Sequence, residues 1–309
     1  MIKNIRQLVA CLLGIILKQP CKLPVGGQAV IEGVLMKGPE LWGLSVRTPE
    51  GKIHEETWHL RDWLSRLPWK LPVIRGVVVM VDMLSTGIRG LNRSAQISLG
   101  EEDQITFIEM AISVIVALLA VVGLFILLPV WVADLFQDGL DLSFAGKNIL
   151  EGIARAAVFI SYLFIISLWR DIRRVFEYHG AEHKTINAYE SGAEMDPASV
   201  SIYSRIHTRC GTSFLLIVIA VSIVVFSLAG TGGVLYKVML RVTLLPVVIG
   251  LSYEIIRFAS RSGRVGEYVL MPALSLQYLT TREPDRTQIE VAVNSLKLAL
   301  GEKTVERVE

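Results

Sequence analysis

The chain has 309 residues, of which 52% are hydrophobic and 19% are charged, and its mean hydropathy is +0.51. A composition this apolar excludes an ordinary soluble domain and indicates a membrane protein. The formal net charge of +2 gives no reason to expect a nucleic-acid partner, and three cysteines without a CxxC pair predict reduced thiols in a cytoplasmic setting.

Residues 1–104 are expected to form an N-terminal α+β segment in the cytoplasm or at the membrane interface. The apolar run at residues 8–17 lacks a cleavage pattern and predicts an uncleaved helix lying along the membrane. Residues 24–60 predict a small sheet, with one run over residues 28–36 and two strands around the turn at 49–51. Glu32, inside the first run, is interpreted as a carboxylate on the solvated face of a strand rather than as a paired or functional group.

A second short apolar run begins at Val77, is interrupted by Asp82 and predicts an amphipathic or re-entrant helix to about Ser98. Four later stretches are long and apolar enough to cross a bilayer, which takes about 20 residues. They cover residues 105–132, 149–169, 212–229 and 234–256, so residues 105–257 are expected to form a four-helix transmembrane domain. Residues 258–309 are expected to form a C-terminal cytoplasmic helical tail, with a helix over about 286–300.

The loops between these stretches predict their orientation. Residues 133–150 contain three aspartates and one lysine, whereas residues 170–211 are rich in arginine. By the positive-inside rule, residues 170–211 and both termini are expected to be cytoplasmic, and the protein is expected to be a multi-pass membrane protein. The lipid bilayer is then its first partner, with other membrane proteins as further candidates.

The string His179-Gly180-Ala181-Glu182-His183 is the strongest functional signal in the chain. Segment 170–190 is expected to continue the second span as a helix, which places both imidazoles on one side, one turn apart. The order H-x-x-E-H is the inverted zincin pattern, in which the glutamate polarises a metal-bound water. We therefore expect a divalent metal, zinc by preference, with Glu182 as catalytic base. Gly180 weakens the helix by about 1 kcal/mol relative to alanine, which counts against a regular helix here.

A catalytic zinc takes three protein ligands and a water, so the two histidines need a third partner. The candidates are His207, Cys210 and Glu254. For Cys210 the alternative is a small buried thiol, and for Glu254 it is an ion pair with Arg257, three residues on along the helix. For the histidine motif as a whole the alternative is a hydrogen-bonded polar cluster without a metal.

Four strings carry a resemblance to a known family: residues 26–36, 177–185, 209–213 and 280–285. With these strings the chain resembles the YqhQ-like family of bacterial inner-membrane proteins over residues 24–300. The resemblance implies a polytopic membrane protein. Members are described as predicted metal-dependent enzymes, and no reaction or substrate accompanies that description.

Two functions from different classes fit these observations. The first is a metal-dependent membrane enzyme that hydrolyses a membrane-associated substrate at the cytoplasmic surface. The second is a non-catalytic scaffold that assists assembly or insertion of membrane proteins. In it the N-terminal sheet, residues 170–211 and the C-terminal helix form one platform, and the histidine cluster is structural. A transporter is a weaker third idea, because polar residues are confined to the fourth span.

Overall fold

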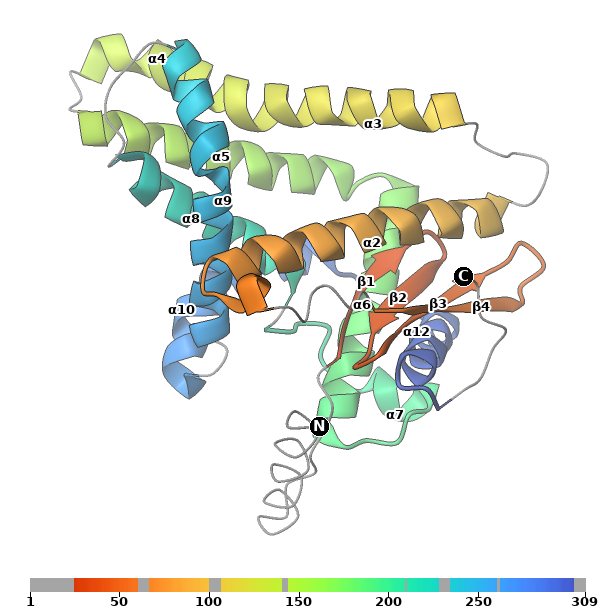
Figure 1. Cartoon of the computed structure of the whole chain (residues 1–309). Coiled ribbons are helices and arrows are strands. Elements are labelled where there is room, and N and C mark those ends of the chain that lie inside the picture. Colours follow the sequence, from red (N-terminus) through yellow and green to blue (C-terminus); the bar gives the residue numbers. More distant parts are fainter. Residues whose placement is uncertain are drawn as a thin grey trace.

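The structure is a computed structural model that describes residues 25–60, 67–99, 107–140, 144–208, 210–227, 234–259 and 262–302. The helix predicted at residues 8–17 lies outside these ranges. The chain forms a small sheet, a long helix beside it, a group of apolar helices and a C-terminal helix that returns to the sheet (Figure 1). The elements in chain order are β1 Gly26–Val30, β2 Gly33–Lys37, β3 Leu41–Arg47, β4 Ile53–His59, η2 Leu67–Lys70, α2 Ile74–Leu99, α3 Phe107–Val122, η3 Gly123–Leu127, α4 Leu128–Leu140, α5 Phe144–Ile166, α6 Arg170–Ser191, α7 Pro197–Ser201, α8 Gly211–Ser227, α9 Val234–Ala259, α10 Gly263–Ser275, α11 Gln277–Thr280 and α12 Arg286–Ala299.

The predicted sheet is present as an antiparallel meander in the order β1-β2-β3-β4. The turn predicted at residues 49–51 is confirmed, and Gly51 has the positive φ of 81° that glycine adopts without strain. The first predicted run is two strands rather than one, because the chain reverses at Glu32, whose φ is 51°. The interpretation of Glu32 as a solvated strand residue is wrong. Its carboxylate accepts hydrogen bonds from Arg174 and from the Tyr178 hydroxyl of α6.

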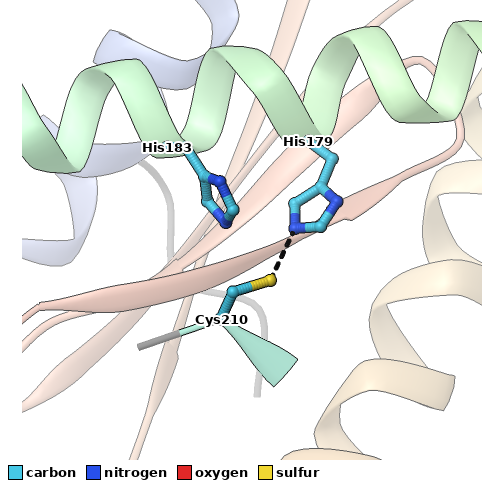
Figure 2. A group of neighbouring side chains, drawn as sticks. All are labelled: His179, His183 and Cys210. Atoms are coloured by element: carbon cyan, nitrogen blue, oxygen red, sulfur yellow. Dashed lines mark hydrogen bonds between the residues drawn. The ribbon is translucent and has the colours of Figure 1, made fainter. Parts of the chain in front are cut away.

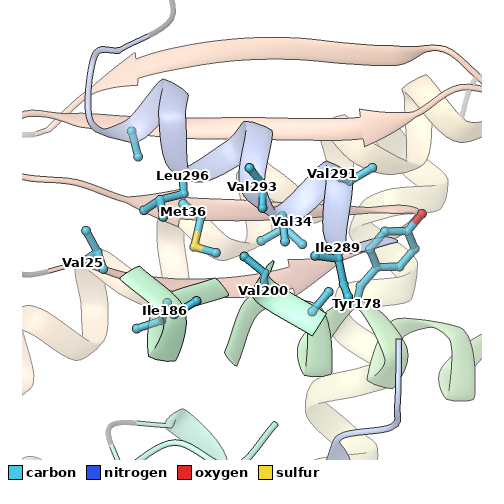
Figure 3. Packing of buried hydrophobic residues seen from close by; sticks show 14 residues of the cluster. Val25, Val34, Met36, Tyr178, Ile186, Val200, Ile289, Val291, Val293 and Leu296 are labelled. Atoms are coloured by element: carbon cyan, nitrogen blue, oxygen red, sulfur yellow. The ribbon is translucent and has the colours of Figure 1, made fainter. Parts of the chain in front are cut away.

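Helices cover both faces of the sheet (Figure 1). On one face, Val34 and Met36 of β2 pack against residues of α6 and α12, among them Ile186 and Leu296 (Figure 3). On the other face, Leu35 belongs to a second apolar cluster, against which Met83 and Ile97 of α2 pack. The first four residues of β2 are therefore all buried, which explains an uninterrupted apolar run where an open sheet would alternate.

The predicted C-terminal helix is confirmed as α12, and it is part of the sheet's core. Asp285 caps it, since the Asp285 side chain accepts from the Gln288 N–H and the Gln288 side chain accepts from the Asp285 N–H. Ser295 Oγ accepts from the Met36 N–H at 3.0 Å and lies 2.7 Å from the Gly43 carbonyl oxygen. A Cβ at position 43 would collide with the Ser295 carbonyl, so glycine is required for α12 to approach β3 this closely.

Among the described residues, three stretches are long and apolar enough to cross a membrane: Ile115–Phe136, Gly146–Ile166 and Val238–Ala259. These three match the first, second and fourth of the about four predicted spans, whereas α8, in the expected third span, is a shorter apolar helix of 17 residues among those that the structure describes. The expected fourth span, taken as the weakest, satisfies the length and hydropathy requirement. Its charged residues Arg241 and Glu254 are paired with Glu151 and Arg75.

Helix α6 does not continue the second span as predicted. Helix α5 ends at Ile166, and Trp169 adopts an extended conformation with ψ of 136° before α6 begins at Arg170. The break lets α6 leave the direction of α5 and run beside β1 and α12 (Figure 1). Glycine 192, with φ of 82°, ends α6 in the left-handed conformation typical of helix C-termini. Helix α6 thereby joins the sheet and carries the histidine motif with it.

Candidate metal centre

The two histidines of the motif lie on one side of α6, as the helical spacing predicts. Their ring centroids are 4.4 Å apart, and both rings point toward Cys210, which directly precedes α8 (Figure 2). His183 and Cys210 are almost completely buried, while His179 is partly exposed. The motif therefore forms a closed cluster between α6 and the start of α8.

Backbone carbonyls fix the orientation of both rings. His179 Nδ1 lies 2.8 Å from the Thr280 carbonyl oxygen, and His183 Nδ1 lies 2.7 Å from the Arg205 carbonyl oxygen. A carbonyl can only accept, so each Nδ1 carries the proton of these hydrogen bonds. The Nε2 atoms then face the cluster, which is the arrangement that metal-binding histidines adopt when a second hydrogen bond holds the ring.

Cys210 completes a set of three ligand atoms. Its sulfur is 3.3 Å from His179 Nε2, and one nitrogen of each histidine and the sulfur all lie within 4.8 Å of one another. In a tetrahedral zinc site such atoms are about 3.3–3.6 Å apart, so shifts of about 1 Å would close the set on an ion. Within the described part of the chain, this is the one group of three histidine, cysteine or acidic residues with that proximity.

The charges of the cluster favour a thiolate. Burial by itself raises the pKa of Cys210, but the adjacent His179 outweighs it through its charge and hydrogen bond, and the pKa of Cys210 falls well below its usual value. Burial likewise opposes protonation of His179, yet the Cys210 charge raises the pKa of His179. A thiolate is the form of cysteine that binds metals.

Glu182 projects into the same region from the next turn of α6. Its side chain is nearly buried, and one carboxylate oxygen lies 3.9 Å from His179 Nε2. Burial raises the pKa of Glu182, although the nearby histidines oppose this shift. A Cβ at position 27 of β1 would come within 3.1 Å of the Glu182 carboxylate, so Gly27 leaves room for it. The first glycine-rich string of the sequence thus lies next to the histidine motif.

The structure separates the three candidates for the third ligand. Cys210 lies with the histidines, whereas His207 is beside them, its ring centroid 5.8 Å from that of His183 and its Nε2 3.5 Å from a Glu190 oxygen. Glu254 is not in the cluster of ligand atoms, because its carboxylate binds the Arg75 guanidinium, with one Nε–oxygen distance of 2.6 Å. The predicted alternative partner, Arg257, is therefore not the main one.

Several residues that hold the site gave no signal in the sequence. Gln277 is fully buried, and its side chain accepts from the His207 N–H at 2.8 Å and donates to the His207 carbonyl at 2.7 Å.

A Cβ at position 180 would collide with the Arg282 carbonyl. Gly180 therefore lets the segment after α11 pack on α6, and the helix is regular at this point. The expectation that Gly180 disturbs the helix is wrong.

The comparisons with known proteins agree with the sequence motifs. Residues 71–302 match the family described as "Protein of unknown function (DUF1385)". The chain is also 31% identical over 287 residues to "Uncharacterized protein YqhQ" of Bacillus subtilis (strain 168), which covers 87% of this chain and 90% of the relative.

This chain belongs to the YqhQ-like DUF1385 family. The resemblance predicted from the four motif strings is thereby confirmed. The matched range contains all the residues of the histidine and cysteine cluster, whereas the whole sheet precedes it. No solved structure matches the chain.

Proposed function

We propose that this protein is a metal-dependent integral membrane enzyme, a hydrolase that holds zinc on His179, His183 and Cys210. The observation that carries this proposal is the convergence of one nitrogen of each histidine and one sulfur within 4.8 Å, with both Nδ1 atoms held by backbone carbonyls. Two histidines and a cysteine are the donor types that zinc prefers, and three protein ligands leave a fourth position for water.

Glu182 is the base of the proposed reaction. A zinc ion held by these residues would supply Lewis-acid activation of a water and of the group that the water attacks. Glu182 lies beside the ligand atoms without joining the three-residue set, so it is placed to accept the proton of the attacking water.

The proposed location is the cytoplasmic surface of a bacterial inner membrane. The sheet contacts both α6, which follows the second candidate span, and α12, which follows the last. All three must lie on one side of the membrane, so the chain must cross it an even number of times between them. Helix α8 would then cross despite its 17 residues, giving four crossings. A substrate that is itself a lipid or a membrane protein fits this position.

Cobalt replacement of the metal tests the proposal without knowledge of the substrate. We expect the detergent-purified full-length chain to bind about one zinc, and the cobalt form to show a thiolate charge-transfer band that Cys210→Ser abolishes. Azide should change the cobalt spectrum, because an open coordination position accepts an exogenous ligand. His183→Ala should lose the metal, whereas Glu182→Gln should keep it. A chain that binds no metal under these conditions rules the proposal out.

Burial of the site favours a second candidate, a scaffold that assists membrane-protein assembly and has a structural metal. His183 is 1% exposed and Cys210 is 7% exposed, and the sheet, α6 and α12 form one packed unit as this function requires. A structural zinc site has four protein ligands, with His207 the nearest additional imidazole. In that case azide leaves the cobalt spectrum unchanged, and His207→Ala changes it.

A further inference from the structure

A cluster of charged side chains is buried among the apolar helices, separate from the histidine motif. Glu151 and Arg155 lie one turn apart on α5, and Nη2 of Arg155 is 2.6 Å from Oε1 of Glu151. Arg241 of α9 binds the second carboxylate oxygen of Glu151 through its own Nη2. The three side chains are between 7% and 11% exposed. Ionisable groups at such depth are costly in a membrane and commonly mark a functional site.

Polar groups from further helices complete the cluster. Arg155 donates to Ser222 Oγ of α8 at 3.1 Å and to the Phe125 carbonyl of η3 at 3.2 Å. Four residues after Phe125 stands Pro129, which has no N–H, so this carbonyl cannot accept the usual α-helical hydrogen bond. The π-helical segment η3 lies at this point, and such segments are frequent at functional sites.

The expectation that polar residues are confined to the fourth span is therefore overturned. Four helical stretches, η3, α5, α8 and α9, bring polar atoms to one place. Measured along the helices, Arg155 lies about 16 Å from the start of α5 and Arg241 about 10 Å from the start of α9. Helix α5 directly follows α4, and α9 also starts near α4 (Figure 1). The cluster therefore lies in the half of the apolar helices that is nearer to α4.

The charges within this cluster do not balance. Two guanidinium groups share the carboxylate of Glu151, which leaves one positive charge. Within the described ranges, no second carboxylate is recorded in contact with either arginine. The ring of Phe226 lies 5.9 Å from Arg155 and 5.8 Å from Arg241, which offsets only part of the cost.

Arg241 also has an unused donor. Its Nη1 is buried and has no hydrogen-bond partner, although the side chain is 8% exposed. A buried guanidinium N–H without an acceptor is costly, and natural structures fill such positions with an acceptor. The ligand that supplies both an acceptor and the missing negative charge is an oxyanion, since arginine binds carboxylates and phosphates through paired N–H groups.

We propose that Arg155 and Arg241 form a binding site for an oxyanion of the phosphate type, located among the membrane-spanning helices and distinct from the histidine cluster. Glu151 holds the two guanidinium groups in position, and Nη1 of Arg241 donates to the bound anion. The anion is either a free phosphate or the headgroup of an anionic phospholipid, which present the same oxygens.

Thermal unfolding with two probes tests this proposal. The full-length chain, washed extensively in neutral detergent to remove lipid, is titrated with inorganic phosphate at constant ionic strength and separately with dioctanoyl phosphatidylglycerol. Dioctanoyl phosphatidylcholine controls for the effect of an added amphiphile. We expect saturable stabilisation by one probe. A response to inorganic phosphate identifies a free anion, and a response to phosphatidylglycerol alone identifies a lipid headgroup.

Arg241→Gln separates a binding site from a structural ion pair. The variant keeps the neutral Glu151–Arg155 pair, so we expect an unchanged or higher melting temperature without ligand and at least about tenfold weaker binding of the probe. Arg241→Lys, which keeps the charge, should also bind more weakly because it lacks the paired donors. The matched control Arg257→Gln, on the same helix, should respond as the wild type does.

Three results overturn the proposal. The first is a washed wild-type chain that neither probe stabilises. The second is a stabilisation that Arg241→Gln retains in full. The third is a large loss of basal stability in Arg241→Gln and in Arg241→Lys, with no probe-dependent stabilisation of the wild type, which identifies a structural ion pair.

Discussion

His183 illustrates how one side chain of the candidate centre is fixed from two directions. The helix places it one turn after His179, and the Arg205 carbonyl holds its Nδ1 at 2.7 Å. Glu182, between the two histidines, lies close to β1, where a Cβ at position 27 would come within 3.1 Å of its carboxylate. Small residues next to the motif therefore shape the space around its carboxylate.

Gly180→Ala tests this dependence. Alanine favours an isolated helix by about 1 kcal/mol over glycine, but here its Cβ would collide with the Arg282 carbonyl. We expect a net destabilisation of about 1–3 kcal/mol, measured by thermal or denaturant unfolding in detergent. Gly123→Ala is the matched control, since a Cβ there meets nothing within 4 Å. If Gly180→Ala were as stable as wild type, the close approach of residue 282 would be refuted.

At the scale of elements, the candidate centre is held between α6, the segment before α8 and α11. Helix α11 has only four residues, yet its Gln277 binds both backbone groups of His207 and donates to Ser213 Oγ at 2.8 Å. These bonds fix the stretch that carries the Arg205 carbonyl and leads to Cys210. The position of two ligands thus depends on a glutamine outside the motif.

Gln277→Ala is expected to weaken zinc binding. Loss of the side chain leaves the N–H and carbonyl of His207 without their partner, and outer hydrogen bonds of this kind contribute about 10–100-fold to metal affinity. Competition with a chelator measures the affinity. Gln96→Ala, at an exposed glutamine of α2, serves as control. A variant that loses stability but binds zinc as tightly as the wild type would show that Gln277 supports the fold alone.

At the scale of the whole molecule, the packing of the sheet limits how the candidate spans can cross a membrane. The sheet lies before the first candidate span, α6 lies between α5 and α8, and α12 lies after α9, yet all three contact one another. An odd number of crossings between any two of them is incompatible with this packing. Helix α8 decides the number of crossings, because its 17 residues are fewer than the 21 or 22 of each candidate span.

Reporter fusions test the crossing of α8. We expect green fluorescent protein fused after residue 302 to fluoresce, since it folds in the cytoplasm, and alkaline phosphatase inserted at residues 141–143 to be active outside. Phosphatase inserted at residues 228–233, between α8 and α9, should be active as well. An inactive enzyme at that last position, with the other two results as expected, would mean that α8 does not cross.

The sequence determined the histidine motif, the apolar helices, the small sheet and the C-terminal helix, because each depends on the spacing of residues close together in the chain. The helical repeat alone places His179 and His183 side by side. Only the tertiary structure decided that Cys210 joins them, that Glu254 pairs with Arg75 instead, and that Arg155 and Arg241 share Glu151. The contacts of Cys210 with His179, of Arg241 with Glu151 and of Glu254 with Arg75 join residues 31, 90 and 179 positions apart, and their geometry follows from how helices pack rather than from any local pattern.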